Sequence, residues 1–170
     1  MTTTSQHNLG EFIVRFQGIE RGINGLIIML AQSDESVVKI LINEHEFGKR
    51  IKTLDVLYLY FLSVQTKMKE QEAREKHAVF HSFIVKIQKL SERRNALVHS
   101  EYTYWEDVAG SSGLLRTNFK LSGGKGERLE QEEELQPHDF KVYFKKMNEI
   151  SELLEMHRMQ IIDWLYPDAK

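Results

Sequence analysis

The chain has 170 residues, of which 41% are apolar and 28% are charged, the balance of an ordinary globular protein. A net charge of −2 and a pI of about 6.4 predict no overall attraction to polyanions, so nucleic-acid binding would need a local patch. The absence of cysteine excludes disulfides, thiol catalysis and cysteine-ligated zinc. Residues 1–8 lack the features of a signal peptide, and the longest apolar run is too short to span a bilayer. We therefore expect a cytoplasmic protein without a membrane partner.

Apolar residues recur at spacings of three and four along residues 9–31, 44–68, 71–98 and 138–165. This period predicts four amphipathic helices, each with one narrow apolar seam. The seam residues are, in chain order, Phe12, Phe16, Ile19, Ile23, Leu26 and Leu30; Phe47, Ile51, Leu54, Tyr58 and Phe61; Phe80, Phe83, Ile87, Leu90 and Leu97; and Phe140, Tyr143, Met147, Ile150, Leu154, Ile161 and Trp164. Such seams are typical of helices packed nearly antiparallel, so we expect an all-α fold, an antiparallel up-down bundle of four main helices.

Two stretches depart from this pattern. Residues 34–43 suit either a short helix or a strand. Between the third and fourth helices, residues 114–121 predict a strand, residues 122–126 its turn, and residues 127–135 a return strand or loop. The bundle is therefore expected to carry a β-hairpin or loop insertion before its last helix.

No linker divides the chain, so residues 9–165 are expected to form a single helical domain. Residues 1–8 are predicted to be a disordered tail, and residues 166–170 a C-terminal tail.

The first helical segment carries three glycines, Gly18, Gly22 and Gly25, within about 40° of one face. Each costs roughly 0.5–1 kcal/mol relative to alanine in a helix. A glycine stripe of this kind favours close approach by another backbone, either in an intramolecular helix crossing or at a subunit interface.

Residues 94–99, Arg-Asn-Ala-Leu-Val-His, are the one segment with a clear chemical signature. Arg94 follows Leu90 at a seam position where the pattern predicts an apolar residue, and a guanidinium there needs an anion or a cleft. Asn95 and His99 are four residues apart, so they are neighbours on a helix. Arginine can hold a phosphate, histidine can move a proton near neutral pH and asparagine can orient both, which suits phosphodiester cleavage without a metal. The same residues also suit a plain helix C-terminus, where cations are favourable.

Residues 94–99 resemble the signature of the HEPN superfamily: an arginine, a polar residue, a few mostly apolar residues and a histidine. The context is similar as well, because the segment lies late in a long helix of a helical domain and a closing helix follows an insertion. The resemblance covers residues 9–165 by architecture and residues 94–99 by sequence. Arg93 is not the motif arginine, because the polar residue follows Arg94.

The resemblance implies a homodimer whose facing motifs form one composite cleft. Many members of the superfamily are metal-independent endoribonucleases of toxin–antitoxin, abortive-infection or other antiviral defence systems. Carried over, Arg94 would bind the scissile phosphate, His99 would act as general acid or base for attack by the RNA 2′-hydroxyl, and Asn95 would orient the pair. One toxin branch has a tyrosine two residues after the histidine, whereas this chain has Glu101 there and Tyr102 next, which puts membership of that branch in doubt.

Local charge favours the same interpretation. Residues 81–100 have a net charge of +3 and residues 127–134 a net charge of −4. The acidic segment suits a solvated surface, or a loop that shields or gates a phosphate site. The residues expected to contact RNA are two basic and three aromatic side chains near the motif, Lys89, Arg93, Tyr102, Tyr104 and Trp105. The aromatic residues equally suit a cover over the end of the bundle.

Three other signals have simpler interpretations. His77 and His81 are spaced like metal ligands, but no glutamate follows His77 as in H-E-x-x-H sites, so we expect no metal. His157 lies on the last seam and is expected to be a hydrogen-bonded core histidine. Residues 123–126, Gly-Gly-Lys-Gly, are expected to form a hairpin turn, since a phosphate loop would need a following serine or threonine.

The leading hypothesis is therefore an endoribonuclease of the HEPN type that needs no cofactor, with RNA as substrate and an antitoxin or other regulatory protein as a further candidate partner. The alternative is a non-catalytic HEPN-like helical dimer that binds a protein or nucleotide partner. A third hypothesis is a helical dimer unrelated to HEPN proteins, in which residues 94–99 merely end a helix.

Overall fold

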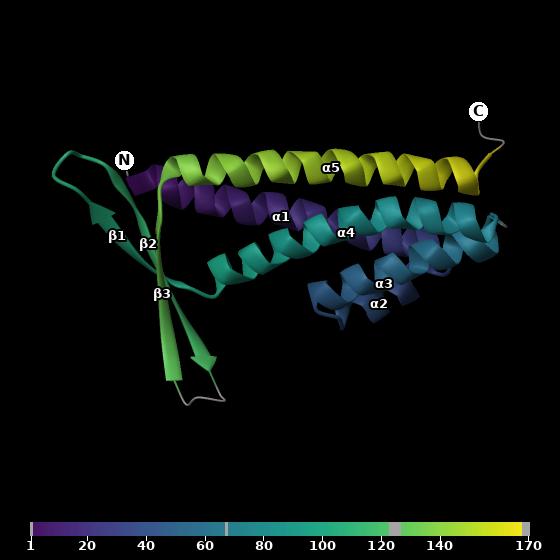
Figure 1. The fold of residues 1–170 in the computed structure, drawn as a ribbon, viewed down its shortest axis with the longest axis horizontal. Coiled ribbons are helices and arrows are strands. Elements are labelled where there is room, and N and C mark those ends of the chain that lie inside the picture. The colour runs from purple at the N-terminus through teal and green to yellow at the C-terminus, as the bar shows by residue number, and fades with distance from the viewer. Residues whose placement is uncertain (1, 67, 123–126, 168–170) are drawn as a thin grey trace. The chain divides into compact units, whose positions relative to one another are not determined.

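The computed structural model describes residues 2–66, 68–122 and 127–167, and these form five α-helices, one π-helical turn and three strands. Figure 1 shows the sheet inserted between the fourth and fifth helices. In chain order the elements are α1 (Thr2–Ala31), α2 (Glu35–Asn43), α3 (Phe47–Tyr60), η1 (Phe61–Gln65), α4 (Glu70–Val98), β1 (Glu101–Glu106), β2 (Ser112–Ser122), β3 (Glu127–Leu135) and α5 (Pro137–Leu165). The fold is thus mostly helical, with a three-stranded antiparallel sheet where a hairpin or loop was expected.

The four periodic segments are helical, as predicted, but the second, expected over residues 44–68, consists of α3 (Phe47–Tyr60) and the π-helical turn η1 (Phe61–Gln65). Their seam residues are buried, except that Tyr143, Leu154 and Trp164 are half-buried. The ambiguous residues 34–43 become helix α2, because the Asp34 carboxylate accepts a hydrogen bond from the Val37 N–H and caps its first turn. None of the described helices combines the length and the apolar character that crossing a bilayer requires.

The start of α1 differs from the prediction of a disordered tail over residues 1–8, because the helix already begins at Thr2. Ser5 is only 3% exposed, and the Asn8 side chain donates a hydrogen bond to the Pro137 carbonyl at 3.3 Å. The Asn8 contact joins this polar segment to a residue that is distant in the chain. Apolar periodicity does not register contacts of this kind.

The chain forms two compact units. The first consists of Met1–Phe16 and Glu92–Met147, and the second of Gln17–Ser91 and Asn148–Lys170. In the second unit, Tyr58 and Phe80 stack with ring centroids 3.8 Å apart. His157 is 2% exposed beside these rings, 3.3 Å from the Gln160 side-chain oxygen. The prediction of a hydrogen-bonded core histidine is therefore confirmed.

The glycine stripe is explained at one position. A Cβ at Gly22 would collide with the side chain of Leu154, so α1 and α5 approach closely there. At Gly18 and Gly25 a Cβ would meet nothing within 4 Å. The intramolecular crossing accounts for Gly22 only, and a subunit interface along the other two glycines stays a prediction.

The sheet of the first unit has the order β1-β2-β3 with both pairs antiparallel. One row of the register joins Tyr102, Arg116 and Glu133 across all three strands. Side chains alternate between the faces of a sheet, and Leu114 and Leu135, paired two positions away from that row, are buried. The row therefore belongs to the covered face. The predicted turn at residues 123–126 lies outside the described residues.

Candidate active site

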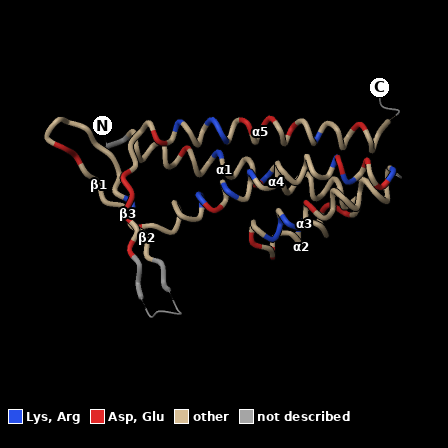
Figure 2. Tube along the Cα trace, in the orientation of Figure 1, with Lys and Arg blue, Asp and Glu red and all other residues tan. Residues whose placement is uncertain are grey.

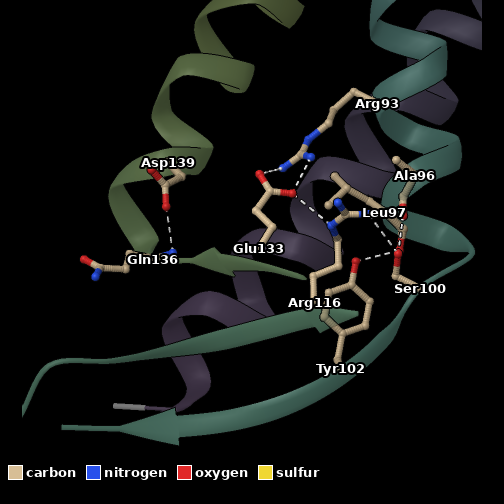
Figure 3. A network of polar contacts seen from close by, with 9 residues as sticks. All are labelled: Arg93, Ala96, Leu97, Ser100, Tyr102, Arg116, Glu133, Gln136 and Asp139. Atoms are coloured by element: carbon tan, nitrogen blue, oxygen red, sulfur yellow. Dashed lines mark hydrogen bonds and ion pairs between the residues drawn. The ribbon is translucent and has the colours of Figure 1, made fainter. Parts of the chain in front are cut away.

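The C-terminal end of α4 is fastened to the sheet by hydrogen bonds to its last carbonyl groups (Figure 3). The Ala96 carbonyl accepts from the Ser100 hydroxyl and from Nη1 of Arg116, the latter at 3.2 Å. The Leu97 carbonyl accepts from the Tyr102 hydroxyl. Carbonyl groups in the last turn of a helix have no partner within the helix, so these contacts satisfy them. They also fix the position of residues 94–99.

Glu133 of β3 binds two arginines at once (Figure 3). Both terminal nitrogens of Arg93 donate to its two carboxylate oxygens at 2.7 and 2.8 Å, and Nε of Arg116 donates at 2.9 Å. The Arg116 side chain is 8% exposed and that of Arg93 17% exposed, so both charges need a carboxylate partner. The Arg93 guanidinium also lies 4.9 Å from the ring centroid of Tyr143. We call Arg93, Arg116 and Glu133 the Glu133 network.

Burial and ion pairing shift the pKa values of Glu133, Arg93 and the nearby Tyr102. Burial alone would raise the pKa of Glu133, but the hydrogen bonds and charges of Arg93 and Arg116 outweigh it and hold the pKa below its usual value. Burial also lowers the pKa of Arg93, but the interaction with Glu133 outweighs that effect, and the pKa is raised. The pKa of the Tyr102 hydroxyl is raised, chiefly by burial. At neutral pH the network consists of two guanidinium ions and one carboxylate.

The candidate catalytic residues lie on the same helix end but outside this network. Arg94 is half-buried, with its guanidinium carbon 5.7 Å from the ring centroid of Phe16 and Nη1 donating to the Asn95 side-chain oxygen at 3.1 Å. Arg94 forms no ion pair with any residue that the structure describes. Asn95 and His99 are exposed. The charge of Arg94 is therefore available to an anion from solution.

The structure joins only part of the predicted catalytic set. Arg94 and Asn95 are in contact, whereas the His99 imidazole makes no hydrogen bond or ion pair with the described part of the chain. Only the backbone N–H of His99 is engaged, donating to the Asn95 carbonyl at 3.1 Å. His99 thus projects into solvent from the residue after α4.

The residues expected to contact RNA have different environments. Lys89 and Tyr104 are exposed, and the Tyr104 hydroxyl donates to Glu106 at 3.0 Å. Arg93 is held in the Glu133 network. Trp105 is half-buried opposite Gly113, whose missing side chain leaves room for the indole. RNA contact by these side chains stays a prediction.

Tyr102 and Tyr104 line an open pocket of about 380 Å³ in the first unit. The other lining residues come from α1 and β2, namely Gln6, Leu9, Gly10, Ile13 and Leu114. This pocket pairs aromatic faces with apolar walls, an environment that suits stacking of a base. The two tyrosines also cover part of α1, so both functions expected for the aromatic cluster are compatible with the pocket.

Two residues important to the site were missed by sequence reasoning, Arg116 and Glu133. Figure 2 shows basic residues along the last turns of α4 and acidic residues along β3, the charge contrast that the sequence predicts. Within the described part of this acidic run, Glu133 is the residue that pairs with these arginines, because Glu132 and Glu134 alternate to the other face and are exposed. The sequence did hold one signal for Arg116. Alternation along the predicted strand puts Leu114 and Arg116 on the same face, so an arginine occupies a position where a buried apolar residue is expected.

A second polar cluster lies in the other unit. The Asp55 carboxylate of α3 lies within hydrogen-bond distance of two histidines of α4. Its oxygens are 3.0 Å from Nε2 of His77 and 2.8 Å from Nδ1 of His81. Sequence spacing singled out the two histidines, but a third ligand from another helix is visible only in the structure. Within the described residues, these three form the group whose potential ligand atoms lie close enough together to bind one metal ion.

No protein-family model, curated protein or solved structure gives a significant match to this chain. The resemblance to HEPN proteins therefore rests on residues 94–99 and on their position at the end of a long helix before an insertion and a closing helix.

Proposed function

We propose that this protein is a metal-independent endoribonuclease of a defence or toxin–antitoxin system. In this proposal the helices form an antiparallel up-down bundle of the HEPN type, and two copies associate so that their two 94–99 segments face each other. Such a symmetric pair would form one composite cleft.

The observation that carries the proposal is the contrast between two adjacent arginines. Arg93 is bound on both terminal nitrogens by Glu133, whereas among the described residues Arg94 has no carboxylate partner and instead contacts the neutral Asn95 and the ring of Phe16. A guanidinium without a carboxylate partner, at the rim of an exposed helix end, is suited to bind phosphate through two parallel hydrogen bonds. It would stabilise the charge that develops on the phosphate during cleavage.

The chemistry follows from the exposed residues beside Arg94. One His99 would accept the proton of the RNA 2′-hydroxyl, whose oxygen then attacks the neighbouring phosphorus. The bond from phosphorus to the 5′-oxygen breaks, and a second His99, from the facing copy, would donate a proton to the departing oxygen. The products are a 2′,3′-cyclic phosphate and a 5′-hydroxyl end. Asn95 would hold the Arg94 guanidinium in position through its side-chain oxygen.

One observation favours the alternative of a non-catalytic HEPN-like dimer that binds a protein or nucleotide. A histidine that acts as a general base is usually oriented by a hydrogen bond to a further group. The His99 imidazole has no such partner within the described residues of this chain. In the catalytic proposal the facing copy or the RNA itself supplies it.

The experiment combines a cleavage assay with a measurement of mass in solution. Wild-type protein is incubated with labelled single-stranded RNA and with DNA of the same sequence, each with and without EDTA. We expect cleavage of the RNA only, at a rate that EDTA does not change, with 2′,3′-cyclic phosphate ends. Sedimentation is expected to show a dimer at micromolar concentration. His99→Ala should reduce the cleavage rate by about 100-fold or more, since proton transfer typically contributes at least that factor.

The controls separate the hypotheses. His45→Ala changes an exposed histidine that lies far along the chain from the motif, and it should cleave RNA like the wild type. Cleavage of DNA, or loss of activity on chelation while the protein stays folded, would place the chemistry at another site. A dimer that binds nucleotide or RNA without cutting it would establish the non-catalytic alternative, and a monomer would rule out the composite cleft.

A further inference from the structure

The second polar cluster has the composition and geometry of a metal site. His77 and His81 are one turn apart on α4, and Asp55 projects from α3 toward both. The three potential ligand atoms, one from each residue, all lie within 4.8 Å of one another. We propose that Asp55, His77 and His81 bind one divalent transition-metal ion, and that this ion is Zn²⁺.

The donor set argues for zinc over the harder cations. Two imidazole nitrogens with one carboxylate suit Zn²⁺ and related transition metals, whereas Mg²⁺ and Ca²⁺ prefer sites built mainly of oxygen. Around a tetrahedral zinc with bonds of about 2.0–2.1 Å, ligand atoms lie roughly 3.4 Å apart. The observed contacts, 3.0 Å from His77 to Oδ1 and 2.8 Å from His81 to Oδ2 of Asp55, are shorter than this, and the three ligand atoms lie within 4.8 Å of one another. Side-chain shifts of about 1 Å would therefore bring them to tetrahedral spacing around one ion.

The three side chains are also held close together before any metal binds. Without a metal, Asp55 directs Nε2 of His77 and Nδ1 of His81 toward the same carboxylate, at 3.0 and 2.8 Å. Each contact needs a proton between nitrogen and oxygen, whereas a nitrogen that binds a metal must be free of its proton. A neutral imidazole meets this need by carrying its proton on the other ring nitrogen, so zinc would replace two hydrogen bonds by three coordination bonds.

The surroundings leave a coordination position open. The side chain of His81 is 52% exposed, whereas those of His77 and Asp55 are 23% and 18% exposed. An open pocket of about 310 Å³ is lined by Asp55 and His77 together with Ser63 and Val64 of η1. Three protein ligands beside an open pocket resemble zinc sites that keep a water or substrate in the fourth position. The π-helical turn at this pocket is a feature that occurs frequently at functional sites.

The site would join two helices that are consecutive in the chain. Asp55 lies in the middle of α3, which continues into η1, and the two histidines lie in the first half of α4. A bound ion would fasten α3 to α4. Zinc should therefore raise the melting temperature as well as bind.

The test uses full-length, untagged protein that has been treated with chelator and dialysed. Zn²⁺ is titrated by calorimetry, and Co²⁺ is added in parallel because its visible absorption reports tetrahedral coordination. We expect one ion per chain and a melting temperature raised by about 5–10 °C at a hundredfold excess of free Zn²⁺ over Kd.

Three variants decide the ligand set. His81→Ala removes the most exposed ligand and should leave the metal-free fold intact, which circular dichroism checks. Asp55→Asn keeps the shape of the side chain but removes its charge. Each should weaken zinc binding at least tenfold, while His45→Ala, an exposed histidine outside the cluster, should bind as the wild type does.

Absence of stoichiometric binding, or wild-type affinity in folded His81→Ala protein, would overturn the proposal. If Asp55→Asn binds zinc like the wild type, only a histidine pair is involved, and the three-ligand site is wrong. All these readouts are made without RNA, so they stand or fall independently of the proposed ribonuclease activity.

Discussion

Arg93 and Arg94 are neighbours in sequence, yet the fold gives them opposite environments. Arg93 points into the Glu133 network, where a carboxylate and a tyrosine ring hold it. Arg94, about 100° further around the helix, lies over the ring of Phe16 and donates a hydrogen bond to the Asn95 side chain, without an ion pair to any residue that the structure describes. The difference arises because β3 places one glutamate, Glu133, on the side of the α4 C-terminus where Arg93 lies. One arginine is therefore held in an ion-pair network, and the other is the one that we propose to bind the RNA phosphate.

The largest change in stability is expected from Glu133→Ala. This substitution leaves Arg93 and Arg116 beside each other without their carboxylate, with side chains only 17% and 8% exposed. Breaking a buried ion pair costs about 3–5 kcal/mol, and we expect about 2–4 kcal/mol here because Glu133 is one-third exposed. Urea denaturation measures the loss.

A double variant sharpens this prediction. Glu133→Gln with Arg116→Met removes one buried cation together with the carboxylate, so it should be less unstable than Glu133→Ala. A Glu133→Ala protein within 0.5 kcal/mol of the wild type would show that the network does not hold the sheet to α4.

A smaller effect is expected in the pH dependence of stability. The pKa of Glu133 in the folded protein lies below its ordinary value of 4.5. Such a group stabilises the fold above the pKa of the unfolded chain, and this stability is lost as pH falls through the folded pKa. The stability difference between wild type and Glu133→Gln should therefore be greatest near neutral pH and shrink below about pH 4.5. A difference that stays constant from pH 7 to pH 3 would contradict the ionised network.

Much of the helical framework could be predicted from the sequence, because seams such as Phe12 to Leu30 are local and periodic. Strand β1 was not predicted, because the alternation of polar and aromatic side chains covers only residues 101–104 and is broken at Trp105. The contacts of Asn8 with Pro137 and of Asp55 with His77 join residues far apart in the chain. Periodicity carries no information on such pairs.

At the candidate site, too, local features could be predicted from the sequence and contacts between distant residues could not. The position of residues 94–99 at the end of a helix follows from local pattern, and the chemistry of the residue types follows from the sequence. The sequence assigns Arg94 to the motif and Arg93 to RNA contact, but it could not show that Arg93 is paired with Glu133, because that pairing depends on which glutamate of β3 faces α4. A shift of one residue in the register of β3 would exchange Glu133 for Glu132 or Glu134.

The central claim is tested most directly by RNA cleavage and urea denaturation on the same preparations of Arg93→Ala and Arg94→Ala. Arg94→Ala should stay a folded dimer, with stability within about 1 kcal/mol of wild type, and should cleave RNA at least 100-fold more slowly, the loss typical of removing a group that stabilises transition-state charge. Arg93→Ala should lose about 1–3 kcal/mol of stability, and its folded fraction should keep cleaving RNA. Folded, dimeric Arg94→Ala protein that cleaves RNA at the wild-type rate would contradict the account.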